Sequence, residues 1–304
     1  MMDTRGVRAP NFIAVAVTLA GACWCQSQST PTWPSAVAHA AHMAPEARIV
    51  VLDIVTGRLL ATSHLQDAAR TLAAPGSTLK PLALYALIAF GRWDPARRIA
   101  CSRNLRIAGR SLNCSHPAAD PMDARQALAW SCNSYFAAVG GTLAQGELRG
   151  LLAPTGLLGQ TGLAPAEATA DFREPHTPDE NRLALLGVDG IRVTPLELAS
   201  AYRWLALQLA SNTTAAQVVQ AGLADSASFG IAGAASLGGV AVAGKTGTAN
   251  LGSGTPSHGW FVGLVPANRP SAIVAVYLPA GHGANAAKVA AELLAHSPLR
   301  QARP

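Results

Sequence analysis

The sequence predicts an α+β fold in which strands from both ends of the chain form one antiparallel sheet, packed with helices and joined to a mainly helical lobe. Strand-like stretches occur near the start of the folded region and again near the C-terminus, while residues 77–235 between them look mainly helical. The chain has 304 residues, of which 50% are hydrophobic and 13% are charged. This composition is typical of one sizeable globular core and excludes an intrinsically disordered chain.

A β-hairpin is predicted where the folded region begins. Two short β-rich runs, Ile49–Ile54 and Leu59–Thr62, flank Thr56 and Gly57, which favour a turn. Three further strands are predicted towards the C-terminus, at Val240–Thr248, Trp260–Val265 and Ser271–Leu278. The last element, Asn285–His296, has apolar residues at a spacing of three to four and is predicted to be a helix.

The helical pattern of the middle region is clearest after Thr194. Thr194 and Glu197 form a capping box with Pro195 at the first helical position. The helix that they open is predicted to continue to Leu209, with an apolar face that includes Tyr202. Strands at the two ends with helices between them therefore indicate a sandwich of sheet and helices.

The N-terminus has the pattern of an export signal. Arg5 and Arg8 precede an apolar run from Phe12 to Ala22, and a helix of this length rises only about 16 Å, against a hydrocarbon core of about 30 Å. We expect residues 1–22 to be a signal peptide, with an uncleaved membrane anchor or lipid attachment at Cys23 as alternatives. The protein is accordingly expected to be exported, to the periplasm or another extracytoplasmic location.

The next segment is rich in Ser, Thr, Pro and Ala and has no clean period. Residues 23–47 are therefore predicted to be a flexible tether, and residues 48–304 the folded domain.

The formal net charge is +6, but the basic residues are scattered, with Arg97–Arg98 the densest pair. We expect no nucleic-acid binding, because no basic stripe with interleaved aromatic residues is present.

Ser77 and Lys80 form the first motif with chemical potential. They follow a Pro-Gly turn and open an apolar stretch, which places both on one face at the start of a helix. A serine hydroxyl becomes a nucleophile when a base removes its proton, and a lysine can be that base when burial destabilises its ammonium. An ordinary serine N-cap beside a surface lysine would have the same sequence pattern.

Two further motifs follow in the chain. Ser131 and Asn133 come after the helical pattern Asp123–Trp130, and Lys245 begins the run Lys-Thr-Gly-Thr-Ala at the end of a predicted strand. A lysine beside two threonine hydroxyls suits the binding of a carboxylate, and the glycine allows close approach of another backbone or a ligand. Each motif alone is weak, but the three in this order match the signature of the penicillin-binding and β-lactamase superfamily.

The chain resembles the transpeptidase domain of penicillin-binding proteins over residues 48–296. The resemblance extends beyond the three motifs, and the matching segments are Ala74–Pro81, Trp130–Phe136, Val193–Ala199, Ala243–Ala249 and Ser257–Gly263. It implies acyl transfer on peptidoglycan stem peptides that end in D-Ala-D-Ala. Ser77 would attack the penultimate carbonyl, Lys80 would accept the serine proton, and Ser131 would relay a proton to the leaving D-Ala.

The resemblance also implies how the substrate is held. Asn133 would bind a substrate amide, while Lys245, Thr246 and Thr248 would bind the terminal carboxylate. The backbone N–H groups of Ser77 and Thr248 would form the oxyanion hole. β-Lactams would acylate the same serine, no metal or organic cofactor would be needed, and other cell-wall synthesis proteins are expected partners.

Two alternatives remain open. A class D-like β-lactamase fits the Ser-Thr-x-Lys pattern, although Asn133 fits it poorly, and a non-catalytic penicillin-binding sensor would keep every motif. The acidic segment Glu167–Glu180 has no Asn four residues after any of its acids, which argues against class A-type hydrolysis. Residues Gly187–Gly190 read Gly-Val-Asp-Gly where relatives often have Gly-Gln-Gly, so the role of that loop is open.

Cys101 and Cys114 flank a polar stretch with Gly109 inside it, which predicts a hairpin or a long loop. An oxidising compartment would permit a disulfide between them, worth roughly 3 kcal/mol, with two free buried thiols as the alternative. Cys132 is expected to pack rather than react.

The eight histidines show no metal-ligand spacing apart from His39 and His42 in the predicted tether, and His258 is interpreted as a loop residue.

Overall fold

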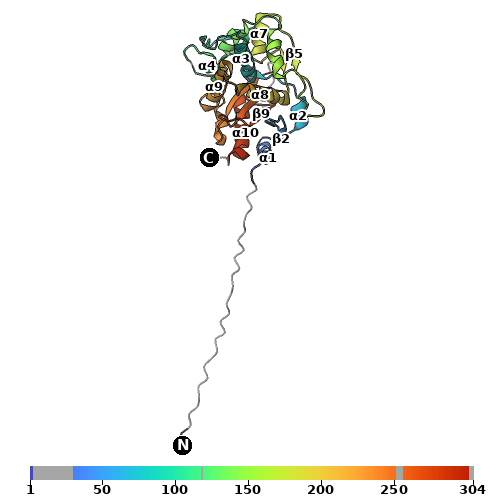
Figure 1. Ribbon diagram of the computed structural model, residues 1–304, viewed down its shortest axis with the longest axis vertical. Helices are drawn as coiled ribbons and strands as arrows, with labels where there is room; N and C mark the ends of the chain where they lie inside the picture. The colour runs from blue at the N-terminus through green and yellow to red at the C-terminus, as the bar shows by residue number, and fades with distance from the viewer. Residues whose placement is uncertain (3–29, 118, 251–255, 301–304) are drawn as a thin grey trace. The chain divides into compact units, whose positions relative to one another are not determined.

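The computed structural model describes residues 1–2, 30–117, 119–250 and 256–300 (Figure 1). Residues Pro31–Pro304 form one compact unit, and the account below concerns that unit. The predicted signal peptide and Cys23 lie outside the described residues, apart from Met1 and Met2. Among the described helices, none combines the length and the apolar character needed to cross a bilayer.

A single five-stranded antiparallel sheet organises the domain. Its strand order is β2-β1-β9-β8-β7, so the N-terminal hairpin pairs with the C-terminal strands along β1 and β9. The predicted α+β class is thereby confirmed, as is the prediction that both ends of the chain build one sheet. The strands are β1 (Arg48–Asp53), β2 (Leu59–Thr62), β7 (Ala243–Ala249), β8 (His258–Val265) and β9 (Ala272–Leu278).

Helices cover both faces of this sheet, which explains why β8 and β9 are buried at every position. Alternate residues of β8 point to opposite faces, so Phe261 and Val265 enter one core while Trp260 and Val262 enter the other. Helix α10 (Gly283–Ala295) packs on the first face, and α8 (Pro195–Leu209) packs on the second, next to the helical lobe (Figure 1).

The first helix, α1 (Trp33–Met43), corrects the predicted tether. Residues 23–47 were expected to lack regular structure, but Thr32 caps a helix at Trp33–Met43 that packs against α10 and β2. Its buried face consists of Ala36, Val37 and Ala40, whose small side chains permit close packing. The Ala- and Ser-rich composition resembles that of a linker, so the narrow apolar stripe was missed.

The helical lobe confirms the predicted middle region. Helix α8 begins and ends as predicted, and its Thr194–Glu197 capping box is present. The stretch between Cys101 and Cys114 contains a short hairpin, whose turn places Ala108 and Gly109 at φ angles of 47° and 78°. The remaining helices are α2 (Leu65–Arg70), η1 (Gly76–Leu79), α3 (Lys80–Ala89), α4 (Ala124–Ala129), α5 (Asn133–Gly140), α6 (Glu147–Leu152), η2 (Ala153–Thr155), α7 (Pro178–Leu185), α9 (Thr214–Ser228), η3 (Gly233–Gly238) and η4 (Pro298–Arg300). The short strand pairs are β3 (Arg106–Ile107) with β4 (Arg110–Ser111), and β5 (Asp171–Phe172) with β6 (Ile191–Arg192).

Candidate active site

The three motifs converge on one cleft between the helical lobe and the edge strand β7. Ser77 lies in the 3₁₀ turn η1, which continues directly into α3, and its side chain is half-buried. It lines two cavities of about 380 and 450 Å³. The other motif residues that line them are Ser131, Asn133, Thr246, Thr248 and Ala249.

Lys80 occupies the start of α3 with its side chain fully buried. Its Nζ donates hydrogen bonds to the Ser131 carbonyl oxygen (3.0 Å), to Ser131 Oγ (3.2 Å) and to Asn133 Oδ1 (2.6 Å). Burial lowers the pKa of Lys80 to about 8, although negative charge on the Cys114 and Cys132 thiols opposes that shift. A lysine with this pKa can lose its proton near neutral pH.

Ser131 connects α4 to α5 in a strained backbone conformation. Its φ angle is 56°, which a residue with a side chain rarely adopts and which costs of order 1–3 kcal/mol. The conformation lets both its carbonyl and its hydroxyl face Lys80. Asn133, at the start of α5, receives the Lys80 ammonium on Oδ1 and donates through Nδ2 to the Leu112 carbonyl (3.0 Å), so it joins the motif to the segment after β4.

The third motif lies on β7, at the edge of the sheet. Lys245 is fully buried and donates to the Thr246 carbonyl (3.1 Å). Burial lowers the pKa of Lys245 well below its ordinary value, and the positive charge of Lys80 lowers it further. Thr248 Oγ1 accepts a hydrogen bond from the backbone N–H of Gly283 (2.9 Å) at the start of α10.

Two glycines allow the backbones of η1 and β7 to meet. A Cβ atom on Gly247 would lie 2.5 Å from the Pro75 carbonyl oxygen, and one on Gly76 would lie 2.9 Å from the carbonyl oxygen of Thr248. Gly76 also has a φ angle of 55°, which favours glycine. This contact brings the backbones of Ser77 and Thr248 to the same cleft, as an oxyanion site made of their N–H groups requires.

Several supporting contacts were not predicted from the sequence. The Tyr202 hydroxyl donates to the Thr78 carbonyl (2.8 Å), and Gly76 N–H donates to the Gly187 carbonyl (2.8 Å). His258 Nε2 and Trp260 Nε1 both contact the Ala74 carbonyl, at 2.8 and 2.9 Å. His258 is therefore a buried residue of β8, which corrects its interpretation as a loop residue, and Gly187 gives the Gly-Val-Asp-Gly loop a role in holding η1.

These residues could have been only partly inferred from the sequence. The predicted apolar face of α8 includes Tyr202, but periodicity does not show that its hydroxyl reaches the turn containing Ser77.

The family model for the penicillin-binding protein transpeptidase domain matches residues 47–297. The chain belongs to this family.

Solved structures agree with the family at the level of the fold. The apo transpeptidase domain of Burkholderia pseudomallei penicillin-binding protein 3 superposes with a TM-score of 0.74 at 20% identity, covering 88% of this chain and 95% of that one. A structure described as a peptidoglycan glycosyltransferase from Burkholderia ambifaria has a TM-score of 0.73 at 20% identity, with 88% and 92% covered.

A third structure comes from work described as the structural coordination of polymerization and crosslinking by a peptidoglycan synthase complex. It has a TM-score of 0.72 at 22% identity, covering 90% of this chain and 60% of that one. A search of curated proteins found no match to the sequence.

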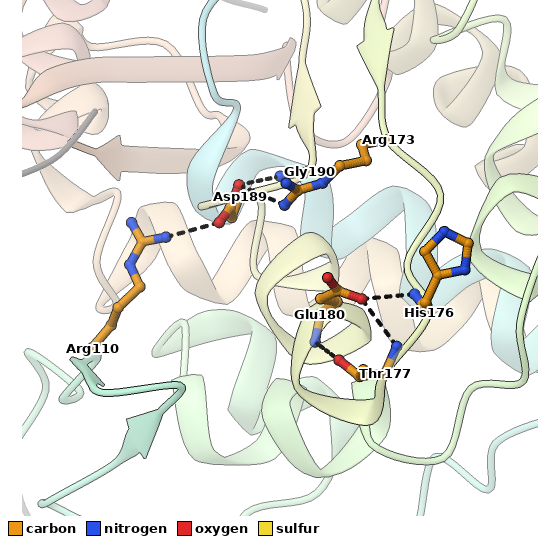
Figure 2. Close-up of polar contacts among 7 residues, drawn as sticks. All are labelled: Arg110, Arg173, His176, Thr177, Glu180, Asp189 and Gly190. Carbon is orange, nitrogen blue, oxygen red and sulfur yellow. Dashed lines mark hydrogen bonds and ion pairs between the residues drawn. The ribbon is translucent and has the colours of Figure 1, made fainter.

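Beside the cleft, this transpeptidase domain has an arginine-lined groove of about 500 Å³. Figure 2 shows Asp189 between two arginines, with Arg110 and Arg173 each 3.3 Å from one of its carboxylate oxygens. Arg110 lines both this groove and the cavity that contains Ser77. The groove is therefore continuous with the cleft on the side of the β3–β4 hairpin.

The acids of the segment 167–180 are held by local contacts. Glu180 accepts the backbone N–H groups of His176 (2.8 Å) and Thr177 (3.0 Å), which lowers its pKa and caps α7 (Figure 2). Burial raises the pKa of Glu167, but hydrogen bonds from the backbone N–H groups of residues 161–164 lower it by more. Neither cavity that contains Ser77 is lined by an acid of this segment.

Cys101 and Cys114 are free thiols in the structure. Their sulfurs lie 3.2 Å apart, against about 2.05 Å in a disulfide, so of the two alternatives that the sequence left open the structure has the free thiols. The Cys132 sulfur lies 3.7 Å from that of Cys114. Contact with the Cys132 thiol, together with backbone N–H groups at the start of α5, lowers the pKa of Cys114.

Proposed function

We propose that this transpeptidase domain is a serine D,D-transpeptidase or carboxypeptidase that forms an acyl-enzyme on Ser77. The observation that carries the proposal is the environment of Lys80, which is fully buried, contacts Ser131 Oγ and has a pKa lowered to about 8. A base with this pKa, three residues from a serine that lines the cleft, suits the activation of a hydroxyl at neutral pH.

The proposed reaction begins when neutral Lys80 takes the proton of Ser77 and the serine oxygen attacks the penultimate D-Ala carbonyl of a stem peptide. The negative charge that forms on the carbonyl oxygen is stabilised by the backbone N–H groups of Ser77 and Thr248. As the peptide bond breaks, Ser131 relays a proton from Lys80 to the leaving amine of D-Ala. An amine or a water molecule then attacks the ester, which forms a cross-link or a trimmed peptide and frees Ser77.

The remaining motif residues would bind the substrate. Thr246, Thr248 and Lys245 lie together on β7, and the side chains of the two threonines line the cleft, where they would hold the terminal carboxylate. Asn133 would contact a substrate amide from the opposite wall. We expect a β-lactam to acylate the same serine, because its strained amide presents a comparable carbonyl and carboxylate.

The surroundings of the cleft favour a transpeptidase over a class A-type β-lactamase. Fast hydrolysis of a penicilloyl ester needs a base for the incoming water, and the acids of residues 167–180 are absent from the lining of both Ser77 cavities.

The proposed place of action is outside the cytoplasmic membrane, because the substrate is found there. We also propose cell-wall synthesis proteins as partners, on the analogy of the structure described as part of a peptidoglycan synthase complex.

Labelling with a fluorescent penicillin tests this function. We expect a stable covalent adduct on the wild-type chain, located at Ser77 by mass spectrometry, and complete loss of labelling in Ser77→Ala with the fold retained. Ser211→Ala, which changes an exposed serine outside the cleft, is the control. Release of D-Ala from a stem pentapeptide would establish the enzyme. Stable labelling without release of D-Ala would indicate a sensor, and loss of the penicillin label within seconds would indicate a β-lactamase.

A further inference from the structure

Four side chains that the proposed reaction does not use gather behind the second motif. The sulfurs of Cys101, Cys114 and Cys132 and a ring nitrogen of His116 all lie within 4.8 Å of one another. Cys114, His116 and Cys132 are buried, and Cys101 is partly exposed. We call these four residues the Cys₃His cluster.

The spacing of the cluster fits a tetrahedral metal site. Zinc binds thiolate sulfur at about 2.3 Å and imidazole nitrogen at about 2.0–2.1 Å, so ligands at the corners of a tetrahedron lie about 3.8 Å apart for two sulfurs and about 3.5 Å for sulfur and nitrogen. The Cys114–Cys132 sulfurs are 3.7 Å apart, and Cys101 Sγ is 3.5 Å from His116 Nε2. The Cys101–Cys114 pair, at 3.2 Å, needs only a small outward movement.

The groups around the cluster orient it as outer-shell partners of a metal do. His116 Nδ1 lies 2.6 Å from the Pro117 carbonyl oxygen, so Nδ1 carries the proton and the lone pair of Nε2 faces the sulfurs. The backbone N–H of Asn133 donates to Cys114 Sγ at 3.1 Å, which stabilises a thiolate there. Packed thiols without a ligand would not require a histidine held in this tautomer.

We propose that Cys101, Cys114, His116 and Cys132 bind one zinc ion in a structural site. Three thiolates and an imidazole are the donor set that favours zinc, and four protein ligands leave no position for a reacting water. Binding would release the thiol protons and form four metal–ligand bonds. The site is distinct from the Ser77 reaction.

The position of the cluster indicates what the metal does. Cys101 precedes the β3–β4 hairpin, Cys114 and His116 follow it, and Cys132 lies between Ser131 and Asn133. The metal would therefore fasten the wall of the cleft to the second motif, at the place where Asn133 already contacts Leu112. It would hold Ser131 and Asn133 in place without contacting the substrate.

Metal content of the full chain tests the proposal. We expect one zinc per chain by inductively coupled plasma mass spectrometry after purification with a reductant and dialysis. Cobalt(II) added to metal-free protein should give the ligand-field absorption of tetrahedral thiolate coordination. Cys101→Ser and His116→Gln should each weaken zinc binding by more than about 100-fold, because even outer-shell changes cost 10–100-fold.

Matched controls separate this site from other histidines and cysteines. The double variant Cys23→Ser with Cys25→Ser should keep its zinc, and so should His296→Gln, which alters the partly exposed group of His39, Glu292 and His296. In the double variant, a thiol reagent should modify no cysteine rapidly while zinc is bound. After a chelator is added, it should modify all three remaining cysteines, Cys101, Cys114 and Cys132. This readout on an otherwise unchanged domain holds even if a ligand variant does not fold.

Three outcomes would overturn the proposal: folded wild-type chain that binds neither zinc nor cobalt, zinc retained by the ligand variants, or a Cys101–Cys114 disulfide found by peptide mapping of protein purified without reductant. None of these measurements uses penicillin or a stem peptide. A failure of the zinc site is thus distinguishable from a failure of the acyl-enzyme reaction.

Discussion

The buried lysines of the cleft and the arginines of the neighbouring groove carry the same charge in opposite surroundings. Lys80 and Lys245 are 0% exposed, whereas the side chains of Arg110 and Arg173 are 37% and 63% exposed. Burial destabilises an ammonium enough to make it a base, but a guanidinium stays charged, and its exposed ion pairs are screened by water. Under the proposed function, this difference assigns proton transfer to Lys80, while the groove contributes little to the chemistry.

Removing the buried amine of Lys80 should have the largest effect on the rate of acylation. Lys80→Met keeps the length of the side chain but deletes the base, so we expect the rate of acylation by a fluorescent penicillin to fall by several orders of magnitude. Rapid-mixing fluorescence measures the rate, and circular dichroism verifies the fold. Lys288→Met, which changes an exposed lysine on α10, is the control. Acylation of Lys80→Met at the wild-type rate would exclude Lys80 as the base.

The contact between η1 and β7 should be nearly as sensitive. In Gly247→Ala the new Cβ would lie 2.5 Å from the Pro75 carbonyl oxygen, so the two backbones must separate. We expect acylation to slow by about 10²–10³-fold, the usual loss when one oxyanion donor is displaced. Gly159→Ala is the matched control, because its Cβ meets no atom within 4 Å. Equal rates for the two variants would show that the close approach does not matter.

The pH dependence of acylation should reveal the lowered pKa of Lys80. The neutral amine is the reactive form, so the rate should fall tenfold per pH unit below about pH 8 and level off above it. The titratable groups that are coupled to Lys80 are the thiols of Cys114 and Cys132 and the ammonium of Lys245. Stopped-flow acylation rates from pH 5 to 10 test this pH dependence, and a rate independent of pH across that range would contradict it. As a control, the residual acylation in Lys80→Met should lack the inflection near pH 8.

The fold was largely predictable because its signals are local. The hairpin turn at Thr56–Gly57 and the capping box at Thr194 each need only a few neighbouring residues, and both are present in the structure. Helix α1 was missed because its buried face, with Ala36 and Ala40, belongs to a core that includes α10, which lies far away in the chain. Local sequence alone did not distinguish it from a linker.

The candidate site divides in the same way. Ser77, Ser131 and Lys245 were predicted to meet because their motifs resemble those of a family, although 54 and 114 residues separate them. The Cys₃His cluster has no such signal: Cys132 is separated from Cys114 by the chain that forms α4, and only the fold brings the two sulfurs to 3.7 Å. Spacing within the sequence therefore left open a disulfide or two free thiols at Cys101 and Cys114 and gave no indication of a four-residue site.

Removing the charge at the centre of the groove should have the smallest effect. Asp189→Asn breaks two exposed ion pairs of 3.3 Å, so the free energy of unfolding should change by less than about 1 kcal/mol, and penicillin acylation should keep its wild-type rate. Urea denaturation and the labelling assay measure the two quantities, with Lys80→Met as the contrasting variant. A large loss of acylation in Asp189→Asn would mean that Asp189 orients the hairpin through Arg110, and the separation between buried chemistry and exposed charge would then be wrong.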